Sequence, residues 1–119
     1  MPGRRIAELL PPQDDDYFVL KPKHSGFFGT PMELLLQFLG ARLLILTGVG
    51  GNSCVWHSAA DAHMREFELS VPADCVASIT VEDNQIALEQ MKRMLKADTR
   101  SSEEMTWSEK IRHGARRSG

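Results

Sequence analysis

The stretch that decides the fold runs from residue 43 to residue 61 and reads LLILTGVGGNSCVWHSAAD. It begins with an apolar run without polar alternation, which is typical of a parallel strand covered on both faces. A turn of small residues follows, and a helical pattern starts at Cys54. A strand, a tight turn and a helix in this order predict an α/β fold in which Cys54 lies at the first turn of a helix.

The segments around this stretch alternate between strand-like and helix-like patterns. Short β-favouring runs are expected to form strands at residues 17–20, 43–47 and 68–71, with 97–100 as a candidate edge strand. Apolar stripes at helical spacing are expected to form helices at residues 31–39, 54–67 and 81–96. Gly40 should close the first of these helices and Thr80 should cap the last. This alternation predicts βαβ units around a mostly parallel sheet.

Composition and charge narrow the class of protein. The chain has 119 residues, 42% of them hydrophobic and 25% charged, which fits one globular domain. A net charge of −2 gives no general field for nucleic acid or an anionic membrane. No run approaches the roughly 18 apolar residues of a membrane span, and the N-terminal residues lack the apolar core of a signal peptide. We therefore expect a soluble, cytoplasmic protein that binds neither nucleic acid nor membrane.

Periodicity is lost near residue 100, which predicts a domain boundary. Residues 1–100 are expected to form the domain, and residues 101–119 a polar, flexible tail. The four basic residues near its end would supply little affinity for nucleic acid at physiological salt.

Three interpretations of Cys54 and its turn remain open from the residues alone. A glycine-rich turn can bind phosphate, although this one lacks the third glycine of G-x-G-x-x-G. A free cysteine can also be a small buried hydrophobe. Alternatively, a thiol at a helix N-terminus can act as a nucleophile when a cation is near it. Lys21 is that candidate cation, because it follows a strand predicted to be parallel to residues 43–47. His24, in the same loop, is expected to be solvated rather than an acid or base.

Three segments resemble a known family. They are KPKHSGFFGTPMELLLQFLG at residues 21–40, LLILTGVGGNSCVWHSAADAHMREFELSVPADCVAS at residues 43–78, and the helix after Thr80. Together they resemble the C-terminal half of the isochorismatase-like cysteine hydrolases, which include nicotinamidases and N-carbamoylsarcosine amidase. The resemblance implies a three-layer αβα fold with a mostly parallel sheet, N-terminally truncated relative to the family.

The resemblance also implies roles for individual residues. Cys54 would be the nucleophile and Lys21 the catalytic lysine, in hydrolysis of an amide-type C–N bond through a thioester. A cis peptide bond between Val49 and Gly50 would aim the N–H groups of Gly50 and Cys54 at the oxyanion. For Phe27 and Phe28, two roles stay open: lining a substrate pocket, or filling the core.

The sequence departs from the family in one respect that bears on catalysis. The family's catalytic aspartate ends a first strand upstream of the lysine, and no such segment is present in this sequence. The family's metal site lies in the same upstream part, so neither a metal nor another cofactor is expected. Two hypotheses follow: an amidase-type hydrolase of a small molecule, or a catalytically incomplete fragment or non-enzymatic interaction protein. Family resemblance and exposed strand edges both favour a homo-oligomer.

Overall fold

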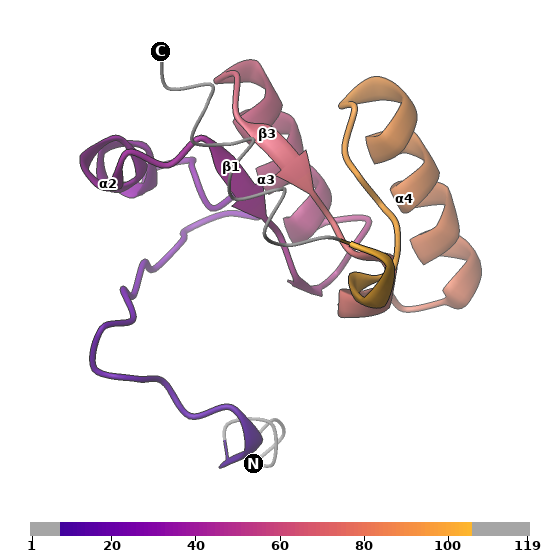
Figure 1. The fold of residues 1–119 in the computed structure, drawn as a ribbon, viewed down its shortest axis with the longest axis horizontal. Helices are drawn as coiled ribbons and strands as arrows, with labels where there is room; N and C mark the ends of the chain where they lie inside the picture. Colours follow the sequence, from indigo (N-terminus) through magenta and orange to yellow (C-terminus); the bar gives the residue numbers. More distant parts are fainter. Residues whose placement is uncertain (1–7, 106–119) are drawn as a thin grey trace.

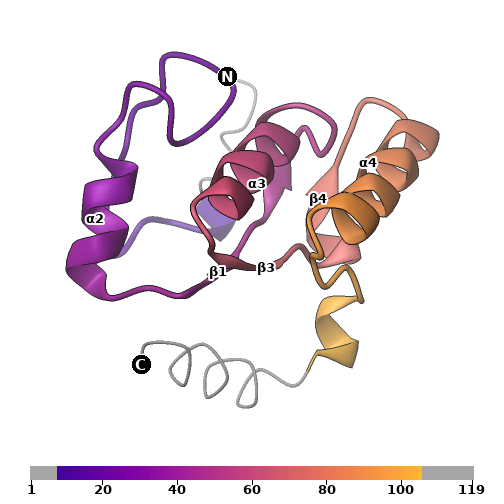
Figure 2. The same cartoon turned by 90° about the horizontal axis from the view of Figure 1, so that it is seen from above.

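The structure is a computed structural model that describes residues 8–105. Helices and parallel strands make up this part of the chain, so the predicted α/β fold class is confirmed. Helix α3 (Cys54–Met64) lies between α2 (Met32–Leu39) and α4 (Val81–Met94), as Figures 1 and 2 show. Among the described residues, no helix has the length and apolar character needed to span a membrane.

The strands form two short parallel pairs. β1 (Leu43–Ile45) pairs with β3 (Glu68–Ser70), and β2 (Gly48–Val49) pairs with β4 (Val76–Ala77). The strand predicted over residues 43–47 is shorter in the structure and ends at Ile45. A second strand, β2, begins at Gly48, whose φ of 118° turns the chain from β3 towards β4. Glycine adopts such a φ without the steric clash that a side chain would cause.

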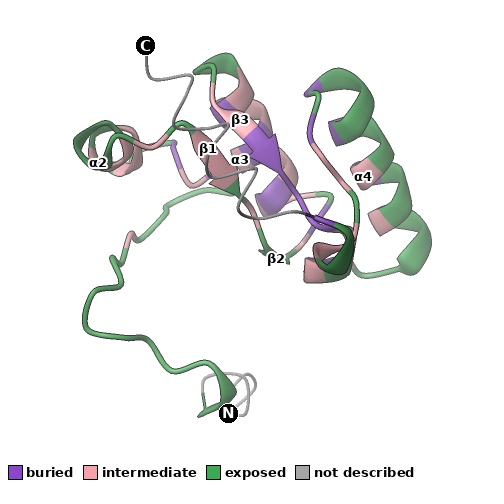
Figure 3. Cartoon of the chain, in the orientation of Figure 1, coloured by how far each residue is buried: buried purple, intermediate pink, exposed green. Residues whose placement is uncertain are grey.

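β3 is paired on both edges within the described residues. Besides β1, it contacts residue Asp98, whose N–H donates to Leu69 O at 3.0 Å and whose carbonyl accepts from Val71 N at 2.8 Å. The candidate edge strand at residues 97–100 therefore forms a single parallel bridge, from Ser70 to Asp98. This double pairing makes β3 the most deeply buried strand in Figure 3.

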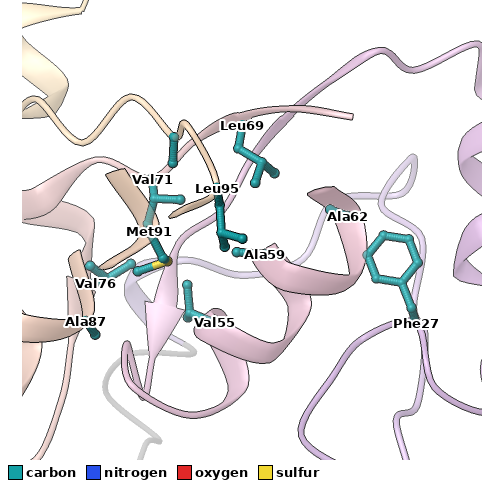
Figure 4. Packing of buried hydrophobic residues seen from close by; sticks show 11 residues of the cluster. Phe27, Val55, Ala59, Ala62, Leu69, Val71, Val76, Ala87, Met91 and Leu95 are labelled. Carbon is teal, nitrogen blue, oxygen red and sulfur yellow. The ribbon is translucent and has the colours of Figure 1, made fainter. Parts of the chain in front are cut away.

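The hydrophobic core lies where α3 and α4 meet the strands (Figure 4). The predicted inner face of α3 is confirmed, and its buried residues are Val55, Ala59 and Ala62. The predicted stripe of α4 also faces inward, with Met91 and Leu95 buried and Leu88 partly buried. Alanine on the inner face of α3 lets the helix approach its neighbours closely, so a short chain can still form a packed core.

The prediction of a buried strand at residues 17–20 is wrong. These residues are extended but pair with no strand of the described chain, and Leu20 is 93% exposed. In Figure 1 this arm leads away from the body of the protein. Tyr17 and Phe18 favour a strand locally, but a strand needs a neighbour to pair with its backbone groups.

Cap residues set the ends of the helices. Gly40 ends α2 with a left-handed φ of 67°, as predicted. Thr80 caps α4, because its side-chain oxygen accepts a hydrogen bond from Asp83 N at 3.1 Å. Helix α3 ends at Met64 rather than at residue 67, because Glu66 takes a positive φ of 67° that turns the chain towards β3.

The first residues of the predicted tail pack on the domain. Ser102, in the 3₁₀ turn η2 (Ser102–Glu104), donates to the Asp74 carboxylate from its hydroxyl at 2.6 Å and from its backbone N–H at 2.7 Å. Met105 is buried, so residues 101–105 belong to the folded unit. Residues 106–119 of the predicted tail lie outside the described residues. The two bonds from Ser102, the hydroxyl first, hold the pKa of Asp74 below its ordinary value.

Replacing Ser102 with alanine is expected to lower the melting temperature at pH 7 by about 1–2 °C. Because the folded-state pKa of Asp74 is lowered, its stabilising effect is present above the ordinary value of 3.8 and is lost as the pH falls through the folded value. Circular-dichroism melts between pH 7 and pH 3 should therefore show the difference between variant and wild type shrinking at acid pH. Ser101→Ala, which loses only a hydroxyl bond to Glu104, is the control. A difference in melting temperature that does not change with pH would contradict a role for the ionised Asp74 carboxylate as the partner of Ser102.

Candidate functional site

The turn before Cys54 is held in place by β4 and the loop that follows it. Gly51 N donates to Ala77 O at 2.8 Å, and Asn52 N donates to the Ser78 hydroxyl at 3.2 Å. A Cβ atom on Gly51 would lie 2.3 Å from the side-chain oxygen of Asn84. That amide cannot move freely, because it bonds to the Ser78 hydroxyl and to Val76 O. Glycine is therefore required at position 51 by close approach.

Lys21 and Cys54, which the sequence predicted to face each other, are in contact. Lys21 Nζ lies 3.3 Å from Cys54 Sγ and also donates to Lys23 O at 3.3 Å. Cys54 is a free, half-buried thiol at the first residue of α3, whereas Lys21 is exposed and lies in a loop rather than at the end of a strand. An ammonium at this distance stabilises a thiolate, which is the reactive form of cysteine.

His24 is exposed, as expected for a solvated histidine, and its imidazole also lies at the thiol. Its Nδ1 is 3.9 Å from Cys54 Sγ and 3.2 Å from Ser53 Oγ. Its ring stacks on that of His57, with centroids 5.5 Å apart. The sequence signal for this contact is the position of His24, which follows Lys21 by three residues in the loop that reaches the same thiol.

The loop that carries Lys21 and His24 is fastened to α3 by polar side chains. Ser58 accepts a hydrogen bond from Gly26 N at 2.9 Å, and Asp61 accepts one from the buried Ser25 hydroxyl. Ser58 and Asp61 follow Cys54 by four and seven residues, so the three side chains share one face of the helix. This polar face of α3 therefore presents the thiol and holds the loop beside it.

The two phenylalanines of the loop lie in different surroundings. Phe27 is only 7% exposed and packs in the core, with its ring centroid 6.3 Å from that of Phe67 and the Arg65 guanidinium above it. In Figure 4 it lies beside Ala62, at the far end of α3 from Cys54. Phe27 thus fills the core, which is the second of its two predicted roles, and a role in substrate binding stays a prediction. Phe28 is 60% exposed, so its role in binding stays a prediction.

The predicted cis bond between Val49 and Gly50 is also wrong, since the described residues contain no cis peptide bond. A non-proline cis bond costs several kcal/mol and persists only where the surroundings enforce it. Val49 is 76% exposed, so little packs around it. The Gly50 carbonyl instead accepts hydrogen bonds from Ser53 N at 3.0 Å and Val55 N at 3.1 Å. The role of the Gly50 and Cys54 N–H groups as oxyanion donors stays a prediction.

The polar groups that the described residues bring to Cys54 Sγ are an ammonium and an imidazole, and neither is a carboxylate. Asp16 lies in the exposed arm and accepts a hydrogen bond from Gln13 N. Within residues 8–105, no group of three histidine, cysteine or carboxylate side chains is arranged to hold a metal ion. The expectation of no bound metal stays a prediction.

A separate groove, of about 1080 Å³, lies at the opposite end of α3. Its walls come from α2, the end of α3 and the start of β3, and include Glu33, Arg42 and His63. It contains none of the groups around the thiol. We place the candidate site at Cys54 because reactive side chains meet there, whereas the groove is an open surface of mixed charge.

Comparisons with known proteins agree on one family. The isochorismatase domain family matches residues 1–104. The chain is 45% identical over 103 residues to the uncharacterized isochorismatase family protein YaaI of Bacillus subtilis, covering 87% of this chain and 57% of that protein. The fold is similar to a nicotinamidase of Staphylococcus aureus, with a TM-score of 0.73 and 31% identity over 81% of this chain and 60% of that one.

A second solved structure gives the same result. An N-carbamoylsarcosine amidase from Thermoplasma acidophilum matches with a TM-score of 0.70 and 32% identity, over 79% of this chain and 53% of that chain. The chain thus spans between about half and three fifths of the length of these relatives.

Replacing Gly51 with alanine is expected to destabilise the turn, because the new Cβ would displace the Asn84 amide and break its bond to Ser78. Loss of such a bond, with overpacking, costs about 1–2 kcal/mol and lowers the melting temperature by roughly 5 °C. Gly50→Ala is the matched control, since its nearest neighbour would be Ser53 Cβ at 3.5 Å. Thermal melts of the two variants measure the effect, and equal melting temperatures would contradict it.

Proposed function

We propose, on the premise that the chain belongs to the isochorismatase family, that it is a cysteine hydrolase cleaving an amide-type C–N bond of a small molecule. The observation that carries the proposal is the 3.3 Å contact between Lys21 Nζ and Cys54 Sγ at the start of α3. The nicotinamidase and the N-carbamoylsarcosine amidase that share the fold support an amide as the substrate class.

The chemistry follows from the position of the thiol. The proposed nucleophile is the thiolate of Cys54, which lies beside the Lys21 ammonium at the N-terminus of the 11-residue helix α3. Attack of the thiolate on the amide carbon gives a tetrahedral oxyanion, for which N–H groups at the turn are the proposed donors. Collapse of this intermediate releases the amine and leaves a thioester, which water then hydrolyses.

Substrate contact, self-association and location in the cell are also part of the proposed function. Phe28 is the exposed aromatic side chain on the loop of Lys21, and we assign it to substrate contact. Self-association is supported by apolar side chains that α2 leaves exposed, among them Leu34 and Phe38. A cytoplasmic location completes the proposal, because catalysis needs Cys54 as a reduced thiol.

A second candidate function is an interaction protein that keeps the fold but does not hydrolyse amides. The observation that favours it is that neither polar partner of Cys54 Sγ is a carboxylate, whereas the family uses an aspartate as the base. The two candidates differ in whether the 119-residue chain turns over an amide at all.

Substitution of Cys54 by alanine is expected to reduce amide hydrolysis by at least about a thousandfold, because no thioester can form. Ammonia release from a panel of small primary amides, nicotinamide included, measures the effect. Cys75→Ser is the control, because Cys75 lies at Asp74 and not at the site. Unchanged turnover in Cys54→Ala would exclude the thiol mechanism, and absence of turnover in the wild type would favour the interaction protein.

Substitution of Lys21 by glutamine is expected to slow alkylation of Cys54 by iodoacetamide at pH 7 about five- to tenfold, because the thiolate loses its ammonium neighbour. The measurement is made by mass spectrometry in a Cys75→Ser background, so that Cys54 is the only thiol. Lys23→Gln is the matched control, since only the backbone carbonyl of Lys23 contacts Lys21. Equal rates for the two variants would argue against a direct effect of Lys21.

A further inference from the structure

We propose that His24 is the proton acceptor and proton donor for Cys54, so that the two residues act as a thiol–imidazole pair. The role in catalysis rests on the proposed function, but the pairing itself does not. The pairing is based on the position of His24 Nδ1, which lies 3.9 Å from Cys54 Sγ, within the reach of a hydrogen bond to sulfur. Contacts of this kind often shorten when a substrate binds.

The position of Nδ1 suits proton transfer. It faces two groups that can donate a hydrogen bond, the Cys54 thiol and the Ser53 hydroxyl at 3.2 Å. A neutral imidazole with an unprotonated Nδ1 accepts from such donors, and the same nitrogen becomes a donor after it takes the proton. His24 can therefore hold the proton at the atom from which a leaving amine would later receive it.

Two contacts hold the imidazole near the thiol. The ring of His57 stacks on it, and His57 Nδ1 is fixed by donating to Ser53 O at 2.7 Å. On the other side, the residues after His24 are anchored to α3 through Ser25 and Gly26. Although His24 is exposed, both its backbone and its ring plane are thus held at the start of the helix.

Lys21 and His24, the two neighbours of the Cys54 sulfur, have different roles. Lys21 and His57 are the titratable groups beside Cys54 and His24 in the described contacts. A Lys21 ammonium has only donors, so it stabilises the thiolate without accepting the thiol proton. Histidine is the side chain that ordinarily exchanges a proton near neutral pH. His24 therefore supplies what the ammonium cannot.

The steps balance with water as the only co-reactant. The Cys54 proton moves to His24 Nδ1, the thiolate bonds to the amide carbon, and the C–N bond breaks as Nδ1 returns the proton to the departing nitrogen. Water then gives a proton to Nδ1 while its oxygen bonds to the thioester carbon. The C–S bond breaks, and the sulfur recovers the proton from Nδ1.

The test compares His24→Asn with the parent chain in a Cys75→Ser background. Asparagine keeps a hydrogen-bonding side chain of similar reach but cannot take up the proton. Alkylation by iodoacetamide should be roughly tenfold slower than in the parent near pH 6.5 and equal to it near pH 10, where thiols are ionised without help. His63→Asn, a histidine at the other end of α3, should follow the parent curve. A His24→Asn curve that also follows the parent would overturn the proposal.

Alkylation needs no substrate, so it separates this inference from the proposed function. A slowed His24→Asn curve supports the pair even if the wild type hydrolyses none of the amides, an outcome that would count only against the amidase activity. Where the wild type does turn over an amide, His24→Asn should lower kcat by about a hundredfold. Turnover and alkylation both at parent levels would overturn the pair while leaving the cysteine hydrolase in place.

Discussion

The site depends on the attachment of the loop at residues 21–27 to the face of α3 that carries Ser58 and Asp61. Ser58 binds the loop backbone at Gly26, and Asp61 binds the buried Ser25 hydroxyl. Helical spacing places both on the face that begins with Cys54, so the helix that presents the thiol also fixes the loop carrying its partners. A buried hydroxyl without such a partner would be costly, which gives the loop one favoured position.

The opposite face of α3 connects this site to the core. Val55, Ala59 and Ala62 pack against the strands and α4, which fixes the axis of the helix. The turn before Cys54 is held separately, through Gly51 and the hydrogen bonds of Ser78 and Asn84. The position of the Cys54 thiol therefore depends both on the apolar packing of α3 and on the hydrogen-bonded turn before it. A change in the packing or in the turn would move the sulfur relative to Lys21 and His24.

Apolar side chains of two segments are exposed in the described chain. The arm containing Tyr17 and Phe18 is exposed, and α2 exposes Leu34 and Phe38. Figure 3 colours most of the arm as exposed and α2 as partly exposed. No carboxylate is in contact with Cys54 Sγ among the described residues. In this setting the His24 imidazole is the group that we propose takes the thiol proton, since the Lys21 ammonium has only donors.

Local patterns in the sequence determined the α/β class, the helix ends at Gly40 and Thr80, and the place of Cys54 after a small-residue turn. These features depend on neighbouring residues, through backbone preference, capping and helical spacing. The pairing of Lys21 with Cys54 was predicted from the residue pattern and from family resemblance, although the strand expected before Lys21 does not form. Tertiary structure alone decided the burial of Phe27, the unpaired arm at residues 17–20 and the approach of His24 to the thiol. Each of these depends on which distant segment packs alongside, and no local pattern contains that information.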